Sequence, residues 1–386
     1  MQHLSLFGRT PPHPDAQRPP GHVSARPAAR QAHEWRLFNC SGDTWDAMFD
    51  DCKAARVSIE FEQYILENDA QGQRFMRLFI EKAQEGLKVF LICDRFGSAF
   101  LTRSPLVREL RHAGGKLHFY NHFTRLTAWM PWRWFPRTHV KTLLIDSRIA
   151  YIGGVCIAER MRDWRDTHIR LMGPVVAQVR HAFNEIENKI MRRRLRMQSA
   201  PPLRDDTFVY LYNKPLSQRR RIYRELLAAV HASERYIYIT SAYFIPNRRF
   251  MKAMAEAVAR GVDMRVLVPV RSDVRLADWV CLSHMRDFFA AGIRIYHYHA
   301  HILHSKTAIA DDQWATIGST NFDMLSFFHN REGNIMTTQQ EVVLALKEHF
   351  THDLQHSEEM TPDIYGRIAW WKKAVGYSAR ALKLLF

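Results

Sequence analysis

The sequence predicts an α/β protein built from two similar halves, each an α/β/α layered unit around a mixed sheet. Three observations support this. Short apolar stretches alternate with stretches of helical period, as is typical of βαβ units. The same order of elements occurs twice, and a charged motif of the first half recurs 165 residues later. With 386 residues, 47% of them hydrophobic, the chain is long and apolar enough to form two cores.

The first half begins to show regular patterning near Trp35. Its predicted elements are a strand at 56–66, a helix at 70–86, a strand at 87–94, a helix at 105–113 and a strand at 117–120. The helix at 70–86 has apolar side chains at helical spacing and ends at Gly86, a residue typical of helix ends.

The second half repeats this plan. Its predicted elements are a helix at 221–233, a strand at 236–244, a helix at 248–260, a strand at 264–270, a helix at 276–291 and a strand at 293–298. Gly261 and Gly292 follow the last two helices. An internal repeat of this kind predicts two domains of the same fold.

Four segments follow from the repeat. Domain 1 covers 34–197 and domain 2 covers 204–358. Residues 1–33 hold six of the sixteen prolines and several arginines, which predicts a disordered basic arm. Residues 359–386 form an amphipathic C-terminal segment.

The recurring motif reads HxKxxxxD and is followed, one strand later, by two small residues. Its two copies are His139, Lys141 and Asp146 with Gly153 and Gly154, and His304, Lys306 and Asp311 with Gly318 and Ser319. Side chains alternate along a strand, so His and Lys share one face. Asp lies on the other face or in the next turn, where it is suited to brace the turn. The small residues let backbone N–H groups approach an anion.

Two such motifs facing each other at the interface of the halves predict one active site for a phosphodiester. One imidazole attacks phosphorus, and the other protonates the leaving alcohol. The two lysines bind the non-bridging oxygens. Asp166 and Glu332 lie 27 and 28 residues after the two histidines, at matching places of the repeat, and are predicted to orient the imidazoles. No metal and no other cofactor is expected.

The doubled motif resembles that of the phospholipase D superfamily, which implies a phospholipase D-like domain in each half. Further phrases are similar to the cardiolipin synthase branch: EQYI at 62–65, YIGG at 151–154, WRDTHIRL at 164–171, SAYFIP at 241–246 and GSTNFD at 318–323. The resemblance covers roughly 35–385.

This resemblance implies an enzyme that transfers a phosphatidyl group onto phosphatidylglycerol through a phosphatidyl-histidine. The commonest donor is a second phosphatidylglycerol, and phosphatidylethanolamine is an alternative donor. It implies His139 as the nucleophile, a catalytic set that includes Asp146 and Asp311, and a peripheral location at the cytoplasmic face of the bacterial inner membrane. The expected phosphate-binding residues are Gly153, Gly154, Ser319 and Asn321.

One position departs from the family pattern. Cys156 stands where the first motif usually has Asn, whereas the second motif keeps Asn321. A thiol is a weak hydrogen-bonding group, so one contact to the first catalytic loop is expected to be lost. The complete His–Lys set argues that the site is still active.

Other functions remain open at this point. A phospholipase D that uses water as acceptor would share the first half-reaction and release phosphatidic acid. The excess of 55 Lys and Arg over 39 Asp and Glu, a net charge of +16, predicts a polyanionic partner and also suits a nucleic-acid phosphodiesterase. The tryptophan-rich segments favour lipid over nucleic acid, and the intact motifs disfavour a catalytically silent lipid-binding protein.

Two segments are predicted to contact anionic phospholipid at a membrane surface. An insertion at 123–136 carries Trp129, Trp132 and Trp134 beside arginines, and the C-terminal segment carries Trp370 and Trp371 beside lysines. An ordinary packed loop and a helix packed on the core are the alternatives. Arginines at 192–196 add positive charge.

The chain is expected to have neither a signal peptide nor a membrane-spanning helix. Its five cysteines are scattered and suit a reducing compartment.

Overall fold

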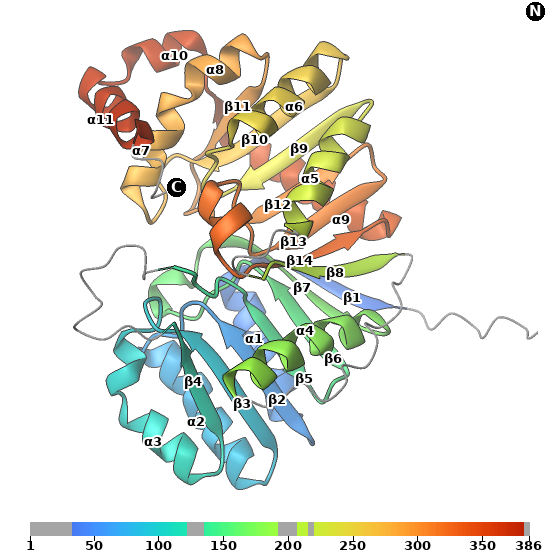
Figure 1. Ribbon diagram of the computed structural model, residues 1–386, viewed down its shortest axis with the longest axis vertical. Helices are drawn as coiled ribbons and strands as arrows, with labels where there is room; N and C mark the ends of the chain where they lie inside the picture. The colour runs from blue at the N-terminus through green and yellow to red at the C-terminus, as the bar shows by residue number, and fades with distance from the viewer. Residues whose placement is uncertain (1–32, 122–134, 192–206, 215–219, 382–386) are drawn as a thin grey trace, which may run out of the picture. The chain divides into compact units, whose positions relative to one another are not determined.

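The computed structural model describes residues 33–121, 135–191, 207–214 and 220–381. The first half is built on a seven-stranded sheet of order β1-β7-β6-β5-β2-β3-β4 (Figure 1). Its strands are β1 (Glu34–Cys40), β2 (Ser58–Gln63), β3 (Lys88–Asp94), β4 (Lys116–Tyr120), β5 (Thr142–Ile145), β6 (Ile149–Gly153) and β7 (Arg165–Met172). The pairs β2–β3 and β3–β4 are parallel and the other pairs antiparallel, so the sheet is mixed, as predicted.

The second half is built on an eight-stranded sheet of order β15-β11-β10-β9-β12-β13-β14-β8. Its strands are β8 (Phe208–Tyr212), β9 (Tyr236–Ser241), β10 (Asp263–Pro269), β11 (Arg294–Tyr298), β12 (Lys306–Ala310), β13 (Trp314–Gly318), β14 (Gly333–Thr337) and β15 (Ser357–Glu359). Reading from β8 gives the same strand order and directions as reading from β1, with β15 added at the far edge. The predicted repeat of two similar halves is therefore confirmed.

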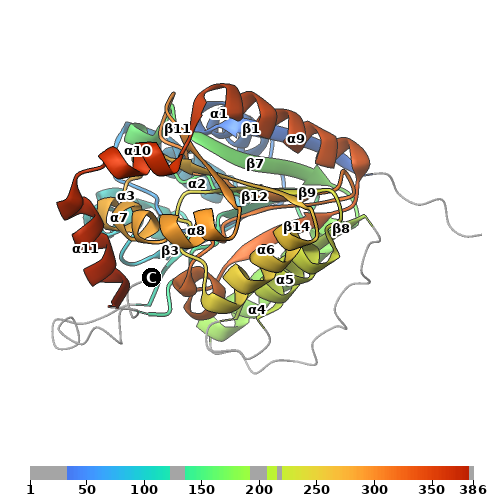
Figure 2. The same cartoon turned by 90° about the horizontal axis from the view of Figure 1, so that it is seen from above.

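Helices cover both faces of each sheet. In the first half, α1 (Ser41–Lys53), α2 (Ala70–Gln84) and α3 (Pro105–His112) share a core on one face, and α4 (Val175–Ile190) lies on the other. In the second half, α5 (Arg221–Ala232), α6 (Arg248–Ala259) and α8 (Met285–Ala290) share a core on one face, and α9 (Gln340–Gln355) lies on the other. Figure 2 shows the second sheet between α5 and α6 on one side and α9 on the other.

The two sheets contact each other through β6 and β7 of the first half and β13 and β14 of the second. Fully buried isoleucines fill this contact, among them Ile152, Ile169, Ile317 and Ile335. Burial of such side chains contributes about 1.5–3 kcal/mol each, so the interface is a core in its own right. It holds the two motifs in fixed positions relative to each other.

The predicted elements agree with the structure to within a few residues, with one exception. The helix expected at 276–291 is two helices, α7 (Arg275–Ser283) and α8, separated at His284. The His284 N–H donates to the Cys281 carbonyl three residues back, which tightens the chain and ends α7. The helix-ending role of Gly86, Gly261 and Gly292 is confirmed, since all three have positive φ.

The remaining short elements are η1 (Phe100–Arg103), η3 (Glu159–Met161), η4 (Leu325–His329), α10 (Pro362–Arg367) and α11 (Trp370–Ala381). The last two make up the described part of the predicted amphipathic segment. No helix within the described ranges is long and apolar enough to cross a membrane. Residues 1–32 of the basic arm predicted at 1–33, and the arginines at 192–196, lie outside the described residues.

Candidate active site

Each HxK segment pairs with the backbone of the opposite half. The His139 N–H donates to the Arg331 carbonyl at 2.8 Å, and the Arg331 N–H donates to the Arg137 carbonyl at 2.8 Å. In the same way, the His304 N–H donates to the Arg165 carbonyl at 2.8 Å. These short β-bridges lie just before β5 and β12, and they fix both histidines at the interface.

The orienting carboxylates are exchanged between the halves. Glu332 of the second half pairs with His139, whose Nδ1 lies 3.1 Å from both carboxylate oxygens. Asp166 of the first half pairs with His304, whose Nδ1 lies 2.6 Å from the Asp166 Oδ2 atom. All four residues are buried. The sequence predicted both acids as orienting residues. Each of them, however, pairs with the histidine of the opposite half, which is the more distant one in the chain.

The two lysines are hydrogen-bonded to the backbone of their own motifs. The Lys141 Nζ donates to the His139 carbonyl at 2.7 Å, and the Lys306 Nζ donates to the His304 carbonyl. Burial lowers the pKa of both lysines, and burial together with the charge of Lys141 lowers that of Lys306 to about 8. The two buried ammonium groups both interact electrostatically with Asp166, and Lys306 also interacts with Lys141.

Burial also lowers the pKa of both imidazoles, that of His139 to about 4. A neutral imidazole that donates from Nδ1 to a carboxylate keeps a lone pair on Nε2. Such an Nε2 is a nucleophile or a general base.

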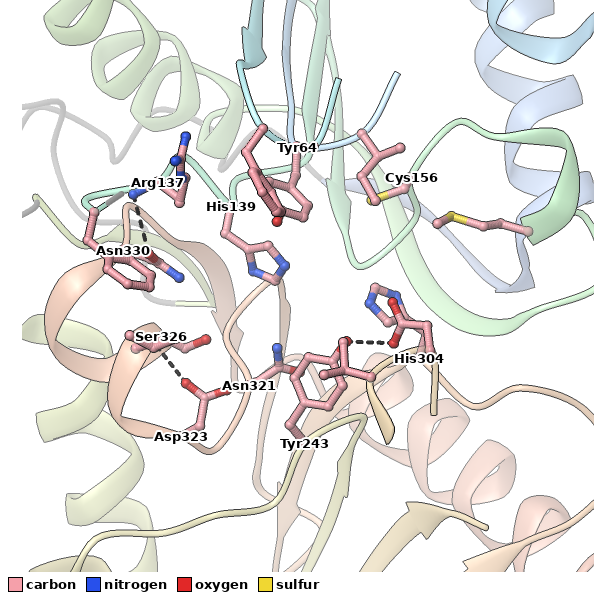
Figure 3. Close-up of a pocket in the computed structure, with 18 of the residues that line it drawn as sticks. Tyr64, Arg137, His139, Cys156, Tyr243, His304, Asn321, Asp323, Ser326 and Asn330 are labelled. Atoms are coloured by element: carbon pink, nitrogen blue, oxygen red, sulfur yellow. Dashed lines mark hydrogen bonds between the residues drawn. The ribbon is translucent and has the colours of Figure 1, made fainter. Parts of the chain in front are cut away.

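Both imidazoles face one cavity of about 450 Å³, which is within the range of ligand-binding cavities (Figure 3). Tyr64 and Tyr243, which follow β2 and β9 at equivalent places of the two halves, line it as well. The Tyr64 ring meets the His139 ring edge-on, with 4.9 Å between centroids. The cavity therefore offers a substrate two imidazoles at once.

Asp146 and Asp311 lie at the far ends of β5 and β12, away from this cavity. Asp146, at φ 52°, accepts the backbone N–H groups of residues 56, 57 and 58, the shortest at 2.7 Å. Asp311, at φ 55°, accepts those of residues 234, 235 and 236. Both aspartates brace the turn, as the alternation of side chains suggests. They are positioning residues, and their inclusion in the catalytic set is corrected.

The predicted phosphate-binding residues also require correction. A Cβ on Gly153 would lie 2.3 Å from the Thr167 carbonyl oxygen, and a Cβ on Gly154 would lie 2.1 Å from Asp166 Oδ1. The pair is small because Asp166 and its strand pack against it. Ser319 donates to Glu332 at 2.5 Å and so positions that carboxylate. Asn321 is the one of the four predicted residues that lines the cavity among the described residues.

Cys156 lies three residues after Gly153, as Asn321 lies three residues after Gly318, and both line the cavity. The departure from the family pattern thus replaces an amide by a thiol in one wall. Burial raises the pKa of Cys156, so the thiol stays protonated and is a poor nucleophile.

Comparison with known proteins agrees with this geometry. A family model described as "Cardiolipin synthase, PLD-like domain" matches residues 226–354. Cardiolipin synthase A of Pseudomonas putida (strain W619) is 31% identical over 330 residues, which cover 83% of this chain and 68% of that protein. The chain belongs to the cardiolipin synthase family. Another similar member, the cardiolipin synthase of Staphylococcus aureus (strain N315), is 28% identical over 88% of this chain and 71% of its own length.

Solved structures share the fold of this family member. Phosphatidylserine synthase of Haemophilus influenzae Rd KW20 superposes with a TM-score of 0.70 at 12% identity, over 91% of this chain and 95% of that one. Polyphosphate kinase of Porphyromonas gingivalis superposes with a TM-score of 0.59 at 12% identity, over 94% of this chain and 55% of that one.

Two buried arginines of this cardiolipin synthase family member escaped the sequence analysis. Arg331 pairs with Glu62 at 2.8 Å, and Arg165 pairs with Asp353 at 2.7 Å. Each arginine directly precedes an orienting carboxylate, Glu332 or Asp166. The repeated Arg–acid dipeptide was the signal that could have revealed them.

Asp323 is a further cavity residue that the sequence analysis missed. It is buried, and its carboxylate accepts the Ser326 N–H at 2.7 Å. Burial raises its pKa to about 7. Figure 3 places Asp323 next to Ser326, on the same side of the cavity as Asn330.

The tryptophans predicted to contact a membrane have different outcomes. Trp129, Trp132 and Trp134 lie outside the described residues. Trp370 and Trp371 lie on α11, which packs on α7, and they are 79% and 45% exposed. The ring of Trp371 contacts Trp279 of α7, with 5.8 Å between centroids.

Proposed function

We propose that this protein is a cardiolipin synthase, a phosphatidyltransferase that joins a phosphatidyl group to phosphatidylglycerol. One observation carries the proposal: two imidazoles, each paired with a carboxylate of the opposite half, line one cavity, and a buried lysine follows each of them two residues later in the chain. Acid–base and nucleophilic work on a phosphodiester needs two such groups on either side of phosphorus. The two relatives named above from Pseudomonas putida and Staphylococcus aureus are named as cardiolipin synthases.

In the first half-reaction, one Nε2 attacks the phosphorus of a donor phosphatidylglycerol. A nitrogen–phosphorus bond forms and the bond from phosphorus to the glycerol oxygen breaks. The other imidazole, protonated in the substrate complex, gives its proton to that oxygen, and glycerol leaves. The ammonium groups of Lys141 and Lys306 stabilise the charge on the non-bridging oxygens.

In the second half-reaction, the imidazole that lost its proton takes one from a glycerol hydroxyl of the acceptor phosphatidylglycerol. That oxygen attacks phosphorus, the nitrogen–phosphorus bond breaks, and cardiolipin forms. We assign His139 as the nucleophile from the family resemblance, with Glu332 orienting it. His304, oriented by Asp166, is then the acid and base.

We further propose that the protein acts as a peripheral protein at the cytoplasmic face of the bacterial inner membrane. The substrates implied by the family carry acyl chains, and the chain has a net charge of +16 that suits anionic lipid. The exposed Trp370 and Trp371 beside Lys372 and Lys373 on α11 are typical of an interfacial helix.

Product analysis tests the reaction. Full-length protein is mixed with vesicles of labelled phosphatidylglycerol, with and without phosphatidylethanolamine, in a metal chelator. Cardiolipin and glycerol are expected. Cardiolipin that appears only with phosphatidylethanolamine would identify that lipid as the donor. Phosphatidic acid alone would identify a hydrolase, and nucleic-acid cleavage without lipid turnover would identify a nuclease.

The two-histidine mechanism is tested by single substitutions. His139→Ala and His304→Ala should each abolish turnover, whereas the exposed His352 of α9 offers a matched control in His352→Ala. Near-normal turnover by either active-site variant would contradict the mechanism. A trapped phosphorylated peptide that contains His304 would reverse the assigned roles.

A further inference from the structure

Two equivalent loops, one from each half, carry exposed apolar side chains at the same spacing. The loop after β3 exposes Phe96 and Phe100, and the loop after β10 exposes Val270 and Val274. Their exposed fractions are 61%, 74%, 45% and 39%. Since β3 and β10 hold the same place in their sheets, these two rim loops are related by the internal repeat.

Both rim loops are tied to the cavity. Phe96 and Val274 line it directly, from opposite halves. In the first loop, Ser98 Oγ donates to the Tyr64 carbonyl at 3.0 Å. In the second loop, the Tyr243 hydroxyl donates to Asp273 at 2.5 Å. Each cavity tyrosine is thus hydrogen-bonded to the rim loop of its own half.

Positive charge lies beside both pairs. Arg95 and Arg103 flank the phenylalanines, and Arg271 and Arg275 each directly follow one of the valines. Three of these arginines are exposed and Arg95 is half-buried. Figures 1 and 2 both show α3 and α7, the helices that follow the rim loops, on one side of the molecule. Apolar side chains next to arginines match the chemistry of an anionic bilayer surface, where acyl chains lie below phosphate groups.

We propose that the two rim loops insert Phe96, Phe100, Val270 and Val274 into the surface of an anionic lipid bilayer, so that the cavity opens against the lipid. The choice of a bilayer as occupant rests on the proposed function. A diacyl substrate drawn fully into water exposes each methylene at a cost of about 0.8 kcal/mol. A cavity whose mouth sits in the bilayer surface receives the headgroup while the acyl chains stay in lipid.

The test uses full-length protein and vesicles of phosphatidylcholine with or without phosphatidylglycerol. The test variant is Phe100→Ser with Val270→Ser, since neither residue lines the cavity. The control variant is Val57→Ser with Leu344→Ser, which removes two equally exposed apolar side chains, at the far end of β2 and on α9. Binding is measured by cosedimentation, and turnover is measured on vesicles and on short-chain phosphatidylglycerol kept below its micelle concentration.

The rim variant should bind anionic vesicles about tenfold or more weakly. It should turn over vesicle lipid correspondingly slowly and short-chain lipid at the wild-type rate. The control variant should bind as the wild type does. Unchanged vesicle binding by the rim variant, or an equal loss in the control, would overturn the inference.

A dimer in lipid-free buffer that the rim variant dissociates would also overturn it, since a second copy would then cover the rim. If the wild type bound vesicles through the rim but did not turn over short-chain phosphatidylglycerol, the proposed reaction would fail while the docking surface stood.

Discussion

Replacing Glu332 by glutamine tests the exchange of carboxylates between the halves. The carboxylate lies 3.1 Å from His139 Nδ1 through both oxygens and is fully buried. A hydrogen bond to a charged group contributes about 1.5–3 kcal/mol. Its loss from a transition state that carries an imidazolium corresponds to roughly a ten- to 150-fold slower reaction.

The substitution has a second effect, which slows the reaction further. The glutamine amide can donate to Nδ1, which moves the ring proton to Nε2 and removes the lone pair that faces the cavity. The analogous change of the orienting carboxylate in a serine protease triad lowers kcat about 10⁴-fold. We therefore expect Glu332→Gln to reduce kcat between about 10²- and 10⁴-fold.

The assay is the turnover of labelled phosphatidylglycerol with product analysis, alongside thermal unfolding of the same preparations. Glu359→Gln is the control, because Glu359 is likewise a paired carboxylate of the second half, with Arg294 as its partner, but lies at the sheet edge on β15. A loss below about threefold for Glu332→Gln, which is under ~1 kcal/mol, would refute the assigned role. So would an equal loss in Glu359→Gln.

Three further outcomes are expected. Lys306 is charged below its pKa of about 8 and neutral above it, so kcat/KM should fall as the pH rises through 8. Lys306→Arg should shift this fall in kcat/KM to higher pH. Arg331→Met leaves Glu62 buried without its ion-pair partner and should lower the free energy of unfolding in urea by about 3–5 kcal/mol. Asp146→Ala removes three backbone hydrogen bonds and should lower the unfolding midpoint, at a cost of about 2 kcal/mol, while folded molecules keep their turnover number. A kcat/KM that does not change above pH 8 would contradict the first prediction. An unchanged urea midpoint for Arg331→Met would contradict the second, and an Asp146→Ala protein that is folded but inactive would contradict the third.

Local patterns predicted the elements and the reactive groups well. The period of two along a strand placed His139 and Lys141 side by side, and the internal repeat identified their equivalents. Helix ends at Gly86 and Gly261 followed from the freedom of glycine at positive φ. These predictions succeeded because each depends on residues that are close together in the chain.

The pairing of acids with histidines could not be predicted in this way. Asp166 and Glu332 occupy equivalent places of the repeat, so a direct and an exchanged arrangement fit the sequence equally well. The packing of the two sheets decides between them, because it brings each Arg–acid dipeptide beside the opposite HxK segment. The role of Gly154 was missed for the same reason, since the atom that excludes a side chain there belongs to Asp166, twelve residues later.

The exchange of carboxylates has a consequence for a protein that is made from one end to the other. A ribosome that has completed only β1 to α4 has exposed His139 and Lys141 to the cell, but not Glu332 or the bridge to Arg331. The nascent half therefore lacks both the carboxylate and the backbone bridge that orient its histidine. Both are supplied only when the second sheet packs against the first.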